Sequence, residues 1–349
     1  MKTSIFNKAL LTILFAFIGI TSSCKNNNLV ENPTPTIDNF AKGADVSWVT
    51  QMEGNGMKFY NASGTQTECM ALLKSLGMNS IRLRVWVNPT QNWNNGQDVL
   101  TKAKRASALG MRVMIDFHYS DTWADPSNQT KPAAWANLSY ADLKTAVATH
   151  TTEILQLLKS NGVSPEWVQV GNETGNGLLW NDGKASVSMK NYAELINEGY
   201  NASKAIFPTA KVIVHLQNGQ DNGLFRWNFD GLKANGGKWD VIGMSLYPNW
   251  YKTKNDWQNC IIDCLANMND MVARYGTEVM IVECGMSWDN PVTCKSFLSD
   301  LIAKTKSVTG KKGLGVLYWE PECYNNWQGY SLGAFDNTGK PTIALDAFK

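Results

Sequence analysis

Two glutamates stand at the ends of apolar segments that are rich in β-branched residues. Glu173 ends the stretch WVQVGNE over 167–173, and Glu283 follows the apolar run 279–282. A pair of carboxyl groups suits hydrolysis of a glycosidic bond, because one gives a proton to the leaving oxygen while the other stays ionised and attacks the anomeric carbon. The carboxyl group that gives the proton needs a pKa raised from about 4.3 toward roughly 6, by burial or by a like charge nearby. Both glutamates are therefore candidate catalytic residues.

Each candidate also has a structural explanation when it is taken alone. A glutamate at a strand end is most often solvated, and Arg82 and Arg84 would serve equally well in structural ion pairs. His118 and His215 would fit a core in which their ring nitrogens are hydrogen-bonded. The catalytic interpretation therefore depends on whether the fold brings these residues together.

The chain repeats one theme, an apolar segment followed by an amphipathic helical stretch. Glycines after several helical stretches, as in SLGMNSIRLRVW, fit the left-handed cap that ends a helix. About eight such units predict one α/β domain, a single (β/α)8 TIM barrel over 41–349. A doubly wound sheet usually has fewer units, and no GxGxxG or P-loop motif follows the first strand. The expected strands are 43–48, 80–86, 112–120, 167–173, 211–216, 239–247, 278–285 and 314–321.

The strand ends of this barrel predict where a site lies. Active-site residues of such barrels stand at the C-terminal ends of the strands, so Glu173 and Glu283 should face a common axis. Arg82 or Tyr247 would supply donors that keep one carboxylate ionised, and Asn172 would hold a sugar hydroxyl. The substrate-binding candidates at these ends and in the following loops are Arg82, Trp86, His118, Asp121, Trp123, Asn172, Trp180, His215, Tyr247, Trp250 and Trp319.

Composition argues against several other functions. The formal net charge of +2 provides no basic surface for nucleic acid. The chain has 3 histidines, of which His150 falls in a helical pattern, and no CxxC pair, so a metal-dependent hydrolase is disfavoured. The 14 tryptophans supply flat apolar rings that suit stacking on sugars as well as core packing. We expect no metal, no cofactor and a monomeric protein.

The N-terminus predicts export. A lysine-containing stretch over 1–8 precedes the apolar run 9–20, and the small residues that end at Cys24 resemble the cleavage site of a bacterial lipoprotein. We expect a signal peptide over 1–24 and a polar tether over 25–40, with Cys24 lipidated and the protein anchored at the cell surface or in the periplasm. Plain secretion is the alternative. Pairing remains open for Cys69, Cys260, Cys264, Cys284, Cys294 and Cys323.

The strand-end segments together resemble the endo-β-1,4-galactanases of glycoside hydrolase family 53. The resemblance runs from about Gly43 to the C-terminus, and the DFHYSDTWADP and GNE-x(5)-LW blocks are specific to this family rather than shared by its clan. It implies a retaining enzyme with catalytic glutamates on strands four and seven. The segments that carry it are GADVSW, SIRLRVWVNP, DFHYSDTWADPSNQTKPAAW, GNETGNGLLW, GMSLYPNW, VECGMSW and GVLYWEP.

The resemblance also implies a role for each candidate. Glu173 would be the general acid/base and Glu283 the nucleophile. Asn172 would bind the sugar 2-OH, Tyr247 would orient the nucleophile, and Arg82 would neutralise it. The implied substrate is unsubstituted β-1,4-galactan, the side chain of pectic arabinogalactan. The cleft would be lined by His118, Asp121, Trp123, Trp180 and Trp319, with Trp319 as the floor of the subsite at the bond being cut.

One departure from the family concerns calcium. Some bacterial members have a long insertion with a calcium site after the nucleophile strand, whereas here only a short loop separates Gly285 from the helical stretch at Cys294. We therefore expect no calcium.

Two alternatives to a galactanase remain. Another retaining β-glycanase of the same clan, a mannanase or an endoglucanase, would share the two glutamates and differ in cleft shape. A sugar-binding surface protein without turnover would keep the barrel, but we would expect it to have lost one carboxylate, and both are present.

Overall fold

The computed structural model describes residues 39–254 and 256–349. The predicted signal peptide over 1–24, its lipidation site Cys24 and the tether up to residue 38 lie outside the described residues, so they stay predictions. Phe40 is already buried, and the first strand begins at the next residue. In the described part, no helix is both long and apolar enough to cross a membrane.

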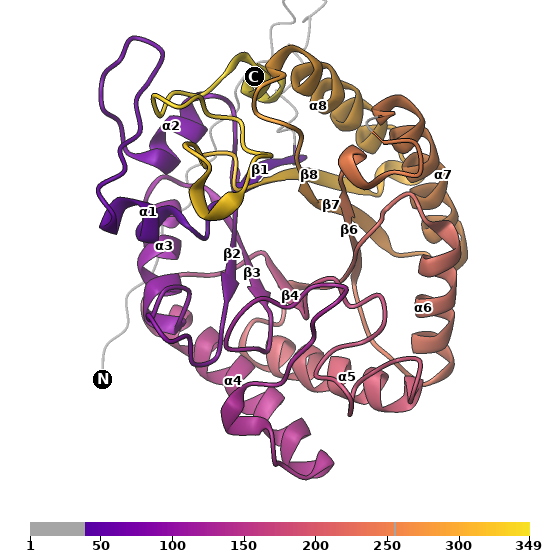
Figure 1. Ribbon diagram of the computed structural model, residues 1–349. Coiled ribbons are helices and arrows are strands. Elements are labelled where there is room, and N and C mark those ends of the chain that lie inside the picture. The colour runs from indigo at the N-terminus through magenta and orange to yellow at the C-terminus, as the bar shows by residue number, and fades with distance from the viewer. Residues whose placement is uncertain (1–38, 255) are drawn as a thin grey trace, which may run out of the picture. The chain divides into compact units, whose positions relative to one another are not determined.

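Within the described residues, the parallel strands follow one another in chain order and close into a barrel. Figure 1 shows them as an inner ring with the longer helices outside. This confirms the predicted (β/α)8 TIM barrel. The strands are β1 Ala41–Asp45, β2 Ser80–Val85, β3 Arg112–Phe117, β4 Trp167–Val170, β5 Lys211–Leu216, β6 Val241–Leu246, β7 Glu278–Cys284 and β8 Gly313–Trp319.

Several helices begin at a short polar side chain that accepts a hydrogen bond from a free backbone N–H of the first turn. Ser139 accepts from Asp142 N before α4, and Asn95 and Asp256 do the same before α3 and α7. The α-helices are α1 Val49–Gly54, α2 Cys69–Ser75, α3 Gly96–Ala108, α4 Tyr140–Ser160, α5 Met189–Ile206, α6 Asn222–Ala234, α7 Trp257–Tyr275 and α8 Pro291–Lys306. Short 3-10 helices are η1 Ala133–Trp135, η2 Pro248–Trp250, η3 Thr309–Lys311, η4 Trp327–Gly329 and η5 Ile343–Phe348.

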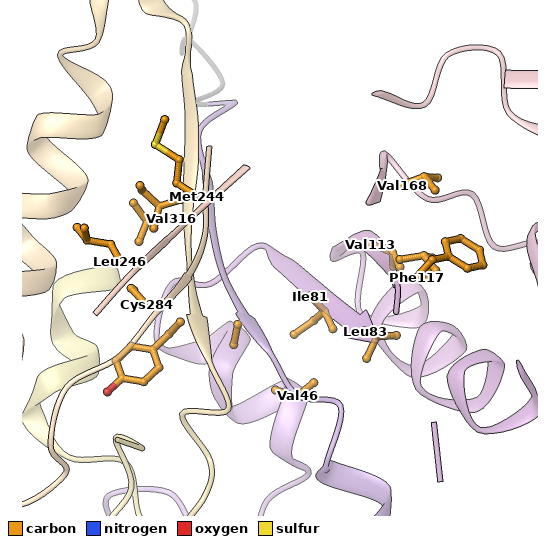
Figure 2. Close-up of a cluster of buried hydrophobic side chains, with 14 of the residues drawn as sticks. Val46, Ile81, Leu83, Val113, Phe117, Val168, Met244, Leu246, Cys284 and Val316 are labelled. Atoms are coloured by element: carbon orange, nitrogen blue, oxygen red, sulfur yellow. The ribbon is translucent and has the colours of Figure 1, made fainter. Parts of the chain in front are cut away.

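Strand alternation divides the core into two layers and selects the residues that enter the barrel. Ile81 and Leu83 of β2 belong to the large apolar layer between strands and helices, part of which Figure 2 shows. Arg82 and Arg84 alternate with them and point to the opposite face. A smaller cluster, which includes Met114, Trp167, Met280 and Val282, fills the barrel interior.

A β-bulge in β7 turns Glu283 toward the barrel axis. Val279 and Ile281 pack outward and Val282 packs inward, so strict alternation would point Glu283 outward. The register with β6 shifts at this point, because Met244 pairs with Ile281 whereas the next residue, Ser245, pairs with Glu283. The extra residue in β7 places Glu283 beside Ser245.

The cysteines of the described chain are all buried free thiols, namely Cys69, Cys260, Cys264, Cys284, Cys294 and Cys323.

Candidate active site

A cavity of about 930 Å³ opens at the C-terminal ends of the strands. Its lining includes both candidate glutamates, Glu173 and Glu283. Most of the other sequence candidates also line it, namely Trp86, His118, Asp121, Trp123, Asn172, Tyr247, Trp250 and Trp319.

Ser245 lies between the two carboxyl groups. Its hydroxyl donates to Glu173 Oε1 over 2.7 Å and lies 3.5 Å from Glu283 Oε2. Because both distances start at Ser245 Oγ, the distance between Glu173 Oε1 and Glu283 Oε2 cannot exceed their sum. Glu173 follows β4 by three residues and reaches this place through a turn in which Gly171 and Glu173 have φ angles of 80° and 47°. Glycine adopts such angles readily, whereas a glutamate there is uncommon and invites a functional explanation.

Arg82 is the cation of the site and is shared among several carboxylates. It is 1% exposed, and its Nη2 lies 2.8 Å from Glu283 Oε1 and 2.9 Å from Asp116 Oδ2. Its Nη1 lies 2.7 Å from Asp45 Oδ2. Such charge-assisted contacts satisfy a guanidinium away from water and hold its partners in fixed positions.

The two glutamates have different electrostatic surroundings. Burial raises the pKa of Glu283, and the Arg82 guanidinium opposes this shift. Tyr247 also donates to Glu283 Oε2 over 3.2 Å. Burial and the neighbouring Glu283 raise the pKa of Glu173, while Ser245 and Arg82 oppose the shift. The geometry therefore favours an ionised Glu283 beside a protonated Glu173.

A buried polar network connects the cavity lining to the residues beneath it. Asn172 Oδ1 accepts from Arg82 Nη2 over 2.8 Å, and its Nδ2 donates to Ala124 O over 2.9 Å. His215 Nε2 lies 2.8 Å from Ser245 Oγ, and burial lowers the pKa of this histidine well below its usual value. A neutral His215 can donate from Nε2 to Ser245, which leaves the hydroxyl proton for Glu173.

Tryptophans form one wall of the cavity. Trp48 lies 5.2 Å from Trp319 and 5.4 Å from Trp123, measured between ring centroids, and Trp86 lies 5.2 Å from Trp123. Trp250 is 62% exposed and packs against Tyr247 with centroids 4.9 Å apart. Flat rings around an open cavity suit stacking on the apolar faces of sugars.

Three candidates do not line the cavity, and a fourth that does is engaged by backbone groups. Arg82 and His215 are buried beneath the cavity lining. Trp180 is not part of this lining; its Nε1 donates to Asn176 O, and Lys184 Nζ lies 4.6 Å from its ring. Asp121 lines the cavity, but its carboxylate accepts from the backbone of Asn88 and Ala133 and so holds two loops. Sugar contacts by these residues stay predictions.

Sequence reasoning missed several residues of the site. Trp48 ends the first predicted strand and could have been included, because strand ends are where such sites lie. Asp45, Asp116 and Ser245 gave weaker signals, since their roles depend on which strand neighbours which. The remaining unpredicted lining residues include Trp93, Asp125 and Tyr330.

A metal site is not found in the part of the chain that the structure describes. It holds no group of three or more His, Cys, Asp or Glu residues that could bind a metal ion. The expectations of no calcium and no cofactor stay predictions.

The chain matches the model of glycosyl hydrolase family 53 over residues 41–348. It is 33% identical to an endo-β-1,4-galactanase of Bacillus subtilis, over 81% of this chain and 70% of the relative. It is 31% identical to an arabinogalactan endo-β-1,4-galactanase of Thermothelomyces thermophilus, over 88% of this chain and 98% of the relative.

Solved structures agree with the sequence relatives. A fungal β-1,4-galactanase has a TM-score of 0.82 and 29% identity, covering 88% of this chain and 98% of its own. The family 53 catalytic domain of Ignisphaera aggregans has a TM-score of 0.81 and 30% identity, and the match covers 91% of this chain and 98% of that domain. The family model spans almost all of the described chain, and the barrel holds two glutamates in one cavity. The chain is therefore a glycoside hydrolase that belongs to glycosyl hydrolase family 53.

Proposed function

We propose that this protein cleaves internal β-1,4-galactosidic bonds of galactan and type I arabinogalactan with net retention. Glu283 acts as the nucleophile and Glu173 as the general acid/base. The observation that carries the proposal is the unequal surroundings of the two carboxyl groups. Glu283 has the cation Arg82 and the donor Tyr247 beside it, whereas Glu173 receives its hydrogen bond from the neutral Ser245.

The charges around Arg82 favour a proton on Glu173. Arg82 already contacts Asp45, Asp116 and Glu283, so an ionised Glu173 would add another negative charge to a buried cluster. Like charges in a desolvated site disfavour joint ionisation. A protonated Glu173 can then serve as the acid near neutral pH.

The reaction has two steps. Glu283 attacks the anomeric carbon, the glycosidic C–O bond breaks, and Glu173 gives its proton to the leaving oxygen. Esterification removes the charge of Glu283, which lowers the pKa of Glu173 relative to the free enzyme. Glu173 can then take a proton from the water that attacks the anomeric carbon. That attack releases Glu283 as a carboxylate and leaves Glu173 protonated.

The separation of the carboxyl groups supports retention. Retaining pairs are about 5–5.5 Å apart, whereas inverting pairs are about 6.5–9.5 Å apart to admit a water molecule. Ser245 contacts Glu173 Oε1 at 2.7 Å and lies 3.5 Å from Glu283 Oε2, so a separation of about 9 Å between these oxygens is ruled out.

Glycosyl azides formed by two variants test the roles of the glutamates. With an activated aryl β-galactoside and azide, Glu283→Ala should form the α-galactosyl azide, because azide attacks from the face that the nucleophile has vacated. Glu173→Ala should form the β-azide and lose about 10²–10⁴-fold in kcat on galactan. Glu278→Ala is the matched control, because Glu278 begins the same strand and pairs with Lys211 over 2.6 Å. Full activity of Glu283→Ala without azide would refute the mechanism.

A substrate panel tests the specificity. The galactanase names of the relatives support galactan. The axial O4 of galactose bends this chain relative to mannan and cellulose, so the cleft should discriminate among them. We expect the wild type to release oligosaccharides from galactan and to leave mannan and cellulose intact. Activity on mannan or cellulose alone would point to another clan member, and binding of galactan without turnover would point to a lectin-like protein.

We also propose that Cys24 anchors the exported protein to a membrane. The TSSC stretch after an apolar run supports this. In the native host, Cys24→Ser should move the protein from the detergent-soluble membrane fraction to the aqueous fraction. Equal partitioning of the variant and the wild type would contradict the anchor.

A further inference from the structure

A buried carboxylate that the proposed reaction does not use lies under the tryptophan wall. Glu320 directly follows β8, is fully buried and has a φ of 48°. Its backbone N–H donates to Asp45 O over 2.9 Å. Its carboxylate accepts the Trp48 N–H, 3.1 Å from Oε2, and a hydrogen bond from Arg84 Nη1. Glu320 therefore ties together β8, β2 and the turn that carries Trp48.

Arg84 connects this carboxylate to the sugar-facing rings. It is 1% exposed, and its guanidinium carbon lies 4.4 Å from the Trp123 ring centroid, 5.0 Å from Trp48 and 5.3 Å from Trp86. These three tryptophans line the cavity. Among the described residues, no acceptor hydrogen-bonds to Arg84 Nε or Nη2. The position of the guanidinium therefore depends on Glu320 and on the ring faces.

Glu322 is a second buried carboxyl group beside Glu320. It is fully buried, and within the described part of the chain neither oxygen receives a hydrogen bond from a conventional donor. Burial and the negative charge of Glu320 raise the pKa of Glu322 well above its usual value. As a neutral acid, Glu322 can donate its proton to a Glu320 oxygen, which satisfies an otherwise unpaired buried group.

We propose that Glu320 is a positioning residue for sugar binding, which holds Arg84 against Trp48, Trp86 and Trp123 while the neutral acid Glu322 donates a hydrogen bond to it. Burial raises the pKa of Glu320 to about 7, and the Arg84 guanidinium opposes this shift. The Glu320 oxygens that accept from Arg84 and from the Trp48 N–H fix the guanidinium, and the guanidinium fixes the angles of the rings on which a sugar stacks. This inference rests on the proposed function only for the identity of the sugar.

Matched variants at both carboxyl groups test the proposal. Glu320→Gln keeps the shape and removes the charge, so KM for galactan should rise about tenfold while kcat changes less than about threefold, the signature of lost uniform binding. Glu322→Gln can still donate to Glu320 and should retain the wild-type KM. Glu322→Leu cannot donate, and should raise KM by at least about threefold. Glu278→Gln, at the other end of the barrel, is the control.

The tryptophan bands of the near-ultraviolet circular dichroism spectrum give a readout that needs no substrate. These bands should change in Glu320→Gln and Glu322→Leu, but not in Glu322→Gln, while the far-ultraviolet spectra stay unchanged. A folded Glu320→Gln with wild-type KM and tryptophan bands would overturn the proposal. If Glu320→Gln does not fold, identical behaviour of Glu322→Leu and Glu322→Gln would overturn it. A wild type that is inactive on galactan would refute the proposed function, and the spectra would still test the positioning role.

Discussion

At the scale of single residues, one cation in the candidate site, Arg82, is shared by several carboxyl groups. Arg82 contacts Asp45, Asp116 and Glu283, and Glu173 lies across Ser245 from Glu283. The presence of Glu173 and Glu283 at this cavity could be predicted from their positions at the ends of apolar strands. Their protonation states could not, because those depend on burial and on neighbours from other strands.

The raised pKa of Glu173 predicts a pH-dependent change in stability. The folded protein holds this proton more tightly than the unfolded chain, whose glutamates titrate at about 4.3. The favourable contribution of the protonated group is therefore complete below about pH 4.3 and is lost as pH rises through the raised folded pKa. Glu173→Gln has no proton to lose, so it should unfold at higher urea concentration than the wild type at about pH 8, with little difference at about pH 4.

A surface glutamate whose pKa is lowered, rather than raised, by folding provides a control for which the opposite pH dependence is expected. Hydrogen bonds from Lys144 lower the pKa of Glu194. Glu194→Gln should therefore lower stability slightly at neutral pH and have less effect in acid. A Glu173→Gln variant whose stability relative to wild type does not depend on pH would contradict the assignment of Glu173 as a protonated acid.

At the scale of elements, strand register decides which residues meet. Gly43 of β1 pairs with Ser80 of β2, and two residues later Asp45 pairs with Arg82. The approach is close, since a Cβ on Gly43 would lie 2.3 Å from Ser80 O and 2.5 Å from Leu317 Cδ2. Gly43 therefore permits the strand contact that brings Asp45 to the cation.

Gly43→Ala should disturb both stability and activity. We expect a loss of about 1–3 kcal/mol in the free energy of unfolding, because the methyl group overlaps backbone atoms. We also expect a lower kcat, because the Asp45–Arg82 pair must shift. Gly110→Ala is the matched control, since a Cβ there meets nothing within 4 Å and only its φ of 69° is unfavourable. Urea unfolding and initial rates check the result, and equal rates in the two variants would refute the link to activity.

At the scale of the whole molecule, the described barrel contains buried free thiols and no disulfide among its described cysteines. The thiols are sealed in the core, and burial raises the pKa of Cys284 well above its usual value. Buried thiols with raised pKa are unreactive, because the thiolate is the reactive form.

Alkylation followed by mass spectrometry tests this state. A Cys24→Ser variant exposed to iodoacetamide without reductant should gain few labels when native and one per remaining cysteine in denaturant. The sites are Cys69, Cys260, Cys264, Cys284, Cys294 and Cys323. Labels that appear only after reduction would reveal disulfides and contradict the structure.

The sequence by itself determined the class of fold and the residue types at the strand ends, because hydrophobic periodicity and helix-ending glycines are local signals. The position of Glu283 at a strand end predicted that it faces the axis, but alternation through Val282 would point the side chain outward, and only the bulge against Ser245 explains why it turns inward. The sequence could not place Trp180 away from the cavity lining. These features depend on the pairing of strands that are distant in sequence, and only the closed barrel brings those strands together.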